Sequence, residues 1–135
     1  MFVIDASVAM AWCFEDEVTD DTEAVLDRLR SEQAIVPAIW PLEVANVLLV
    51  AERRGRISEA QINRFIRLLG QLPIKLDDAG SDLAGVVATG RVHGLSSYDA
   101  SYLLLAERAG LPLATLDARL GGAATQAGVP LLIAP

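Results

Sequence analysis

Residues 1–8 of the chain, MFVIDASV, join a short apolar run to the start of a helix. The run Phe2–Ile4 favours a strand, and a run that is apolar at every position is typical of a strand buried on both faces, as in a parallel sheet. The residues from Ala6 onward favour a helix, so Asp5 lies at a strand-to-helix junction. Such junctions lie at the C-terminal edge of a parallel sheet, where α/β proteins bind their ligands.

Composition predicts one small aliphatic domain. The 135 residues are enough for a single core, so we expect one domain over residues 1–135. With 53% hydrophobic and 5% aromatic residues, an α/β fold is favoured over an all-β sandwich. Cys13 and His93 are the only cysteine and histidine, so we expect neither an internal disulfide nor a Cys/His zinc site. This composition suits a reducing cytoplasm.

Hydropathy and charge exclude two broad classes of protein. Asp5 interrupts the apolar start of the chain, and no uninterrupted apolar run is long enough to span a bilayer, so we expect a soluble protein that does not enter a membrane. The 11 basic and 18 acidic residues give a formal charge of -7, which argues against a general nucleic-acid coat protein. An enzyme that meets phosphate through bound cations stays compatible with this charge.

Strand and helix patterns alternate along the whole chain, without a linker or repeat. The expected strands are residues 2–4, 34–36, 74–76, 113–116 and 131–133. The expected helices are residues 6–12, 19–32, 41–55, 58–69, 78–93 and 96–109, with a weaker one from about 118 to 128. This alternation predicts an α/β layered sandwich.

Four acids share one placement, at or within the first turn of an expected helix. They are Asp5, Glu43, Asp99 and Asp117. Each alone has a structural explanation, as a helix cap or as a complement to the helix dipole. In a parallel α/β sheet, however, these helix starts open on the same edge, where neighbouring carboxylates repel and raise each other's pKa. A divalent cation relieves that repulsion, and oxygen-only ligands select hard ions such as Mg²⁺ or Mn²⁺.

No other chemical motif competes with this acidic set. The chain has no GxxxxGK[ST] phosphate loop, no GxGxxG fingerprint and no GxSxG elbow. Carboxylate-bound metal ions support in-line displacement at phosphorus, so metal-assisted phosphodiester hydrolysis is the reaction class that the sequence favours.

Four segments, taken together and in order, carry a family resemblance. They are FVIDASVAM at 2–10, PLEVANVL at 41–48, SSYDASYLLLAERAG at 96–110 and LATLDARL at 113–120. This ordered set resembles the four motifs of the PIN-domain ribonucleases, and within them the VapC-type toxins of bacterial toxin–antitoxin pairs. The resemblance covers essentially the whole chain.

The resemblance implies a three-layer α/β sandwich with a central parallel sheet of about five strands in the order 3-2-1-4-5. It also implies an Mg²⁺- or Mn²⁺-dependent endoribonuclease that acts on RNA, forms a homodimer and is inhibited by a cognate antitoxin. By motif match, Asp5, Glu43, Asp99 and Asp117 become the catalytic and metal-binding acids. Ser7, Thr115 and Asn46 become supporting residues, although Ser7 and Thr115 also suit purely structural roles at a helix start and a strand end.

Several alternatives stay open at this stage. A housekeeping PIN-type nuclease without an antitoxin and a non-catalytic interaction module on the same fold would carry a similar sequence. A phosphoacceptor receiver domain fits poorly, because it needs a lysine after its last strand and the only lysine is Lys75, in the third expected strand. Leu42, Ala45 and Leu49 flank the main apolar stripe of the 41–55 helix, so they serve either a partner surface or a deeper core.

Overall fold

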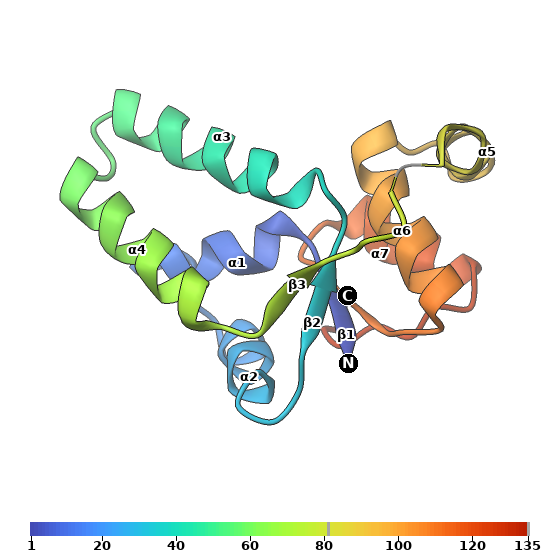
Figure 1. Cartoon of the computed structure of the whole chain (residues 1–135), viewed down its shortest axis with the longest axis horizontal. Coiled ribbons are helices and arrows are strands. Elements are labelled where there is room, and N and C mark those ends of the chain that lie inside the picture. The colour runs from blue at the N-terminus through green and yellow to red at the C-terminus, as the bar shows by residue number, and fades with distance from the viewer. Residues whose placement is uncertain (81, 135) are drawn as a thin grey trace.

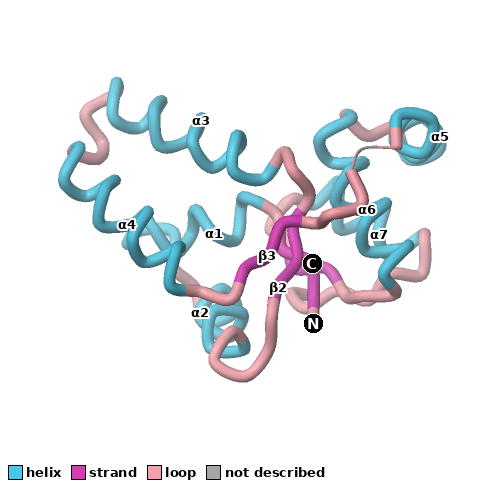
Figure 2. Tube along the Cα trace, in the orientation of Figure 1, coloured by secondary structure: helices cyan, strands magenta, loops and turns pink. Residues whose placement is uncertain are grey.

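Four short parallel strands form the middle layer of the computed structural model, which describes residues 1–80 and 82–134. The strands are β1 (Phe2–Ile4), β2 (Ala34–Val36), β3 (Ile74–Leu76) and β4 (Leu113–Ala114). Their order is β3-β2-β1-β4, and every pairing is parallel. Figure 2 shows the strands gathered in the centre of the molecule, with helices around them.

Helices cover both sides of this sheet. They are α1 (Ala6–Cys13), the short 3₁₀ helix η1 (Glu15–Glu17), α2 (Asp20–Arg28), α3 (Trp40–Arg53), α4 (Glu59–Gln71), α5 (Leu83–His93), α6 (Ser97–Ala109) and α7 (Ala118–Gln126). In Figure 1, α1 to α4 lie on one side of the strands and α5 to α7 on the other. The predicted α/β class with three layers is therefore confirmed. Within the described residues, no helix combines the length and apolar character needed to cross a bilayer.

The central strand β1 is the most deeply buried segment of the sheet. Phe2, Val3 and Ile4 are all fully buried, because β2 and β4 flank the strand and helices cover both of its faces. This matches the uninterrupted apolar run from which the strand was predicted. The chain leaves β1 directly into Asp5 and α1, so the acid lies at the end of the central strand.

The predicted fifth strand is wrong. Residues 131–133 contribute one isolated bridge, between Leu113 and Leu131, in place of a strand. Its would-be neighbour β4 ends at Ala114, because the next backbone N–H groups donate to side chains: Leu116 to the Ser7 hydroxyl and Asp117 to the Thr115 hydroxyl. Because β4 has only two residues, residues 131–133 have few backbone groups to pair with. The sheet of the described residues therefore has four strands.

Two helices are shorter than predicted by more than two residues at one end. The 19–32 helix ends at Arg28. The 78–93 helix begins at Leu83, because the Asp82 carboxylate accepts a hydrogen bond from the Gly85 N–H and caps it there. Ser81 in that prediction and Pro135, at the end of the expected domain, lie outside the described residues.

Helices α3 and α4 form an antiparallel hairpin that extends away from the sheet (Figure 1). The predicted capping box at the start of α4 is present: Ser58 Oγ accepts from the Gln61 N–H at 3.2 Å, and Gln61 Oε1 accepts from the Ser58 N–H at 2.9 Å. These two bonds satisfy backbone donors that a helix start otherwise leaves unpaired.

We expect Ser58→Ala to lower the free energy of unfolding by about 1 kcal/mol, because it removes the N-cap acceptor of α4. Thermal or urea unfolding measures this change. Ser31→Ala is the matched control, since the Ser31 hydroxyl is exposed and makes only a 3.5 Å contact with the Arg28 carbonyl. Equal stability of the two variants would contradict a role for the capping box.

Candidate functional site

A cavity of about 570 Å³ opens at the C-terminal edge of the sheet. Residues from the starts of α1, α3, α6 and α7 line it. In Figure 1 the starts of α3 and α6 lie near each other at the upper end of the strands. Six of the seven residues predicted for the site line this cavity: Asp5, Ser7, Glu43, Asn46, Asp99 and Asp117. The seventh, Thr115, is buried and hydrogen-bonds to Asp5.

Asp5 is the buried acid of the group, with 5% of its surface exposed. Its carboxylate accepts hydrogen bonds from Ser7 Oγ at 2.5 Å, from Thr115 Oγ1, and from the Val8 N–H at 3.3 Å. Burial raises its pKa to about 6, although these three hydrogen bonds act in the opposite direction. Asp5 therefore caps α1, which is the structural role that the sequence allowed for it. Asp5 also lines the cavity.

Ser7 and Thr115 tie Asp5 to the segment that carries Asp117. Each hydroxyl donates to Asp5 and accepts a backbone N–H: Ser7 Oγ from Leu116 at 3.0 Å and Thr115 Oγ1 from Asp117 at 3.0 Å. Asp117 itself caps α7 by accepting from the Leu120 N–H at 2.9 Å. The two hydroxyls thus hold the ends of β1 and β4 in one arrangement, and with them two of the four acids.

Glu43 has a partner that the sequence analysis missed. The Tyr102 hydroxyl donates to Glu43 Oε1 at 2.6 Å, and the tyrosine is almost fully buried. Burial, followed by the hydrogen bond to Glu43, raises the pKa of Tyr102 far above its ordinary range, so the phenol stays a donor. The missed signal was spacing, because Tyr102 follows Asp99 by three positions and so shares its face of α6.

Asp99 is half-buried, and its carboxylate accepts no hydrogen bond from the described residues. Its backbone N–H donates to Ser96 Oγ at 3.1 Å, so Ser96 alone caps α6. Burial, then the charges of Asp117 and Glu43, raises the pKa of Asp99, while Arg119 lowers it. Asp99 is therefore a carboxylate whose side chain has no capping duty and which its neighbours repel.

The donor set fits a hard divalent cation in type and in charge. All four acids offer oxygen, and the repulsion felt by Asp99 is the conflict that a cation relieves. In residues 1–80 and 82–134, however, no three acidic, histidine or cysteine side chains lie close enough together to hold one ion as they stand. An ion held here would therefore require side-chain rotation, and the Asp99 carboxylate accepts no hydrogen bond from the described residues that would oppose it.

Fold and site together define a class: a small three-layer α/β protein with an acidic cavity at the C-terminal edge of its sheet. The chain belongs to the PIN-domain family, whose model matches residues 2–125. The family resemblance of the four sequence segments is thereby confirmed.

Related proteins agree with this assignment. The chain is 35% identical to "Ribonuclease VapC3" of Mycobacterium tuberculosis over 121 residues, which are 90% of this chain and 85% of that protein. It is 30% identical to "Ribonuclease VapC3" of Pyrobaculum aerophilum over 120 residues, which are 87% of this chain and 90% of that protein.

Solved structures show the same fold. A crystal structure of a protein from Pyrobaculum aerophilum matches with a TM-score of 0.72 and 26% identity, over 90% of this chain and 83% of that one. A chain of a toxin–antitoxin complex from Klebsiella pneumoniae matches with a TM-score of 0.58 and 17% identity, over 87% of each chain.

We expect Thr115→Val to lower the free energy of unfolding by about 1–3 kcal/mol, because it leaves the Asp117 N–H and one Asp5 oxygen without a partner. Chemical denaturation measures the loss. Thr125→Val is the matched control, since the exposed Thr125 hydroxyl bonds only the Gly121 carbonyl of its own helix, at 3.1 Å. If Thr115→Val is as stable as the control, the hydroxyl does not hold the two strand ends.

Proposed function

We propose that this protein is a metal-dependent endoribonuclease that hydrolyses RNA phosphodiester bonds, and that it is the toxin of a toxin–antitoxin pair. The observation that carries the proposal is the meeting of four carboxylates, from four separate helix starts, on one cavity. Two relatives that bear the name ribonuclease, at 30% and 35% identity over most of the chain, support the choice of RNA as substrate.

Asp5, Glu43, Asp99 and Asp117 would hold the Mg²⁺ or Mn²⁺ ion. Bound there, the ion would lower the pKa of a water and stabilise the charge that develops on the phosphate. The protein contributes the arrangement of the ligands. These side chains differ in how freely they can rotate. Asp5 and Asp117 are fixed as helix caps, while Asp99 is free to turn toward the ion.

Four uncharged residues complete the proposed site. Ser7 and Thr115 orient Asp5 by donating to its two oxygens. Tyr102 orients Glu43 in the same way, which makes it a positioning residue that acts through the acid. Asn46 is exposed at the cavity and offers an amide to the substrate.

Helix α3 supplies a surface for the proposed partners, a cognate antitoxin and a second copy of the chain. Leu42 is 67% exposed and Leu49 51% exposed, and Ala45 between them is exposed as well. The alternative that these residues fill a deeper core is therefore wrong. An apolar helix face open to water is typical of an interaction surface.

The alternatives from the sequence differ in what they require of the acids. A housekeeping PIN-type nuclease would use the same cavity and differ only in lacking an antitoxin. A non-catalytic interaction module has no need for a carboxylate such as that of Asp99, which is half-buried, repelled by its neighbours and without a hydrogen bond from the part of the chain that the structure describes. This favours the enzyme.

We expect Asp99→Asn to abolish RNA cleavage in Mg²⁺ or Mn²⁺ and to leave the fold intact. In EDTA the variant should be more stable than the wild type by up to about 1 kcal/mol, because it removes one of the repelling charges. The measurements are cleavage of a single-stranded RNA and thermal melts with EDTA and with Mg²⁺. Mg²⁺ should raise the melting temperature of the wild type more than that of the variant.

Asp27→Asn is the control, since it makes the same substitution at a 70% exposed position on α2, outside the cavity. Wild-type cleavage by Asp99→Asn would end the claim that Asp99 is catalytic. Lost cleavage with an undiminished response to Mg²⁺ would place Asp99 at the substrate and not at the ion.

A further inference from the structure

The acidic cavity contains one basic side chain among the described residues that line it, Arg56. Arg56 lies in the turn between α3 and α4, and in the cavity lining it accompanies Met10, Phe14 and Glu17 from α1 and the turn that follows. Its side chain is 42% exposed, so a ligand in the cavity can reach the guanidinium. The chain has a formal charge of -7, so a single basic side chain beside the acids indicates a specific role in binding.

The guanidinium of Arg56 is held in place on two sides. Its central carbon lies 3.9 Å from the centroid of the Phe14 ring, and that ring is buried. Its Nη2 donates to both oxygens of Asp16, at 2.9 and 3.1 Å, and Glu17 Oε1 lies 3.8 Å away. The guanidinium thus lies over the Phe14 ring, while Asp16 accepts both hydrogen bonds from Nη2 and Glu17 adds an ion pair.

The contact with Phe14 and the ion pairs with Asp16 and Glu17 differ in strength. Asp16 and Glu17 are 77% and 44% exposed, and ion pairs between exposed groups contribute only about 0–1 kcal/mol. A backbone phosphodiester presents two charged oxygens to the planar fork, as a carboxylate does, so it can accept hydrogen bonds from the same guanidinium. Replacing the carboxylates by a phosphate therefore costs little, and the contact with buried Phe14 survives the exchange.

A second cavity continues from the first at this point. Its volume is about 590 Å³, and it shares Phe14 and Arg56 with the acidic cavity. Arg64 of α4 also lines it. Arg56 thus lies where the two cavities meet.

We propose that Arg56 binds a backbone phosphate of the RNA beside the scissile bond, and that Asp16 and Glu17 occupy its guanidinium until the RNA replaces them. This inference rests on the proposed ribonuclease function, whose site it extends by one substrate contact. Phe14 holds the guanidinium in place for the RNA. The carboxylates of Asp16 and Glu17 in η1 compete with the RNA phosphate for it.

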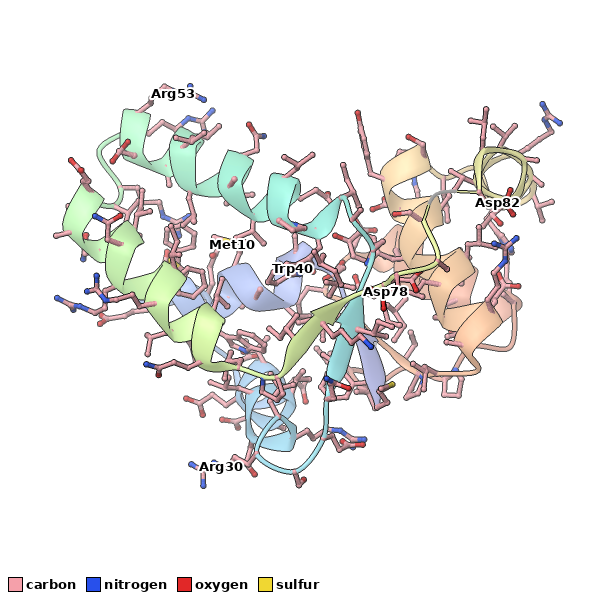
Figure 3. The ribbon with its side chains drawn as sticks, viewed as in Figure 1. Met10, Arg30, Trp40, Arg53, Asp78 and Asp82 are labelled. Carbon is pink, nitrogen blue, oxygen red and sulfur yellow. The ribbon has the colours of Figure 1, made fainter. Side chains whose placement is uncertain are left out.

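The test compares Arg56 and Asp16 with an equivalent pair elsewhere. Arg30 and Asp27 form an exposed pair at 3.1 Å, and Arg30 lies at the lower edge of the molecule in Figure 3, beyond the end of α2. Arg56→Gln and Asp16→Asn are therefore matched by Arg30→Gln and Asp27→Asn, which change the net charge identically. Binding of a short fluorescent single-stranded RNA is followed by anisotropy in EDTA, over a range of salt concentrations, so that the readout does not depend on cleavage.

We expect Arg56→Gln to weaken RNA binding about tenfold and to reduce the salt dependence by about 0.7 in the log–log slope, the value for one phosphate contact on a single strand. Arg30→Gln should leave the slope unchanged. Asp16→Asn should tighten binding more than Asp27→Asn, because it frees a guanidinium in the cavity. Arg56→Lys should restore the slope but only part of the affinity, since it keeps the charge and loses the planar fork.

Thermal melts verify that each variant is folded, and Asp16→Asn tests the inference without disturbing the contact with Phe14. Wild-type affinity and slope in folded Arg56→Gln, or equal effects of Asp16→Asn and Asp27→Asn, would overturn the inference. The proposed function fails differently, through a wild-type protein that does not cleave RNA in Mg²⁺ or Mn²⁺. In cleavage assays the inference predicts a raised KM and a nearly constant kcat for Arg56→Gln.

Discussion

Asp5 is a charged group buried at the end of the strand that every other part of the sheet surrounds. A buried carboxylate is costly unless hydrogen bonds satisfy it, and here two hydroxyls and one backbone N–H do so. Those hydroxyls also bind the backbone that leads from β4 to α7. Satisfying one buried acid therefore fixes the position of Asp117, ends β4 after two residues and shapes the floor of the cavity.

The remaining acids depend on the same arrangement of parallel strands. Because the strands run parallel, the helices α1, α3 and α7 that follow β1, β2 and β4 start at one edge; α6, which follows α5 and leads into β4, starts there too, and these N-termini favour negative charge. Glu43 and Asp99 come from α3 and α6, whose starts both line the cavity there. Burial, and then the charges of Asp117 and Glu43, still raise the pKa of Asp99. The fold thus keeps carboxylates close enough to repel one another, and binding of a cation would relieve that repulsion.

Local sequence patterns predicted the parts of the molecule that local physics determines. The buried run of β1, the capping box at Ser58 and the acids at helix starts follow from residue type and spacing alone, and the structure has them where the sequence placed them. The fifth strand was wrong because the length of β4 depends on side-chain acceptors, Ser7 and Thr115, whose contacts with it are tertiary. Arg56 escaped notice for the same reason, since its partner Asp16 lies 40 positions away.

The most direct test of the proposed site is where a metal ion binds. A crystal of the wild-type protein grown with Mn²⁺ would show the ion by its anomalous scattering. We predict one strong peak in the cavity between the starts of α1, α3, α6 and α7, with Asp99 turned toward it and Asp5 as a second ligand. A well-ordered cavity with no manganese peak, or manganese bound only at other acids, would contradict the account.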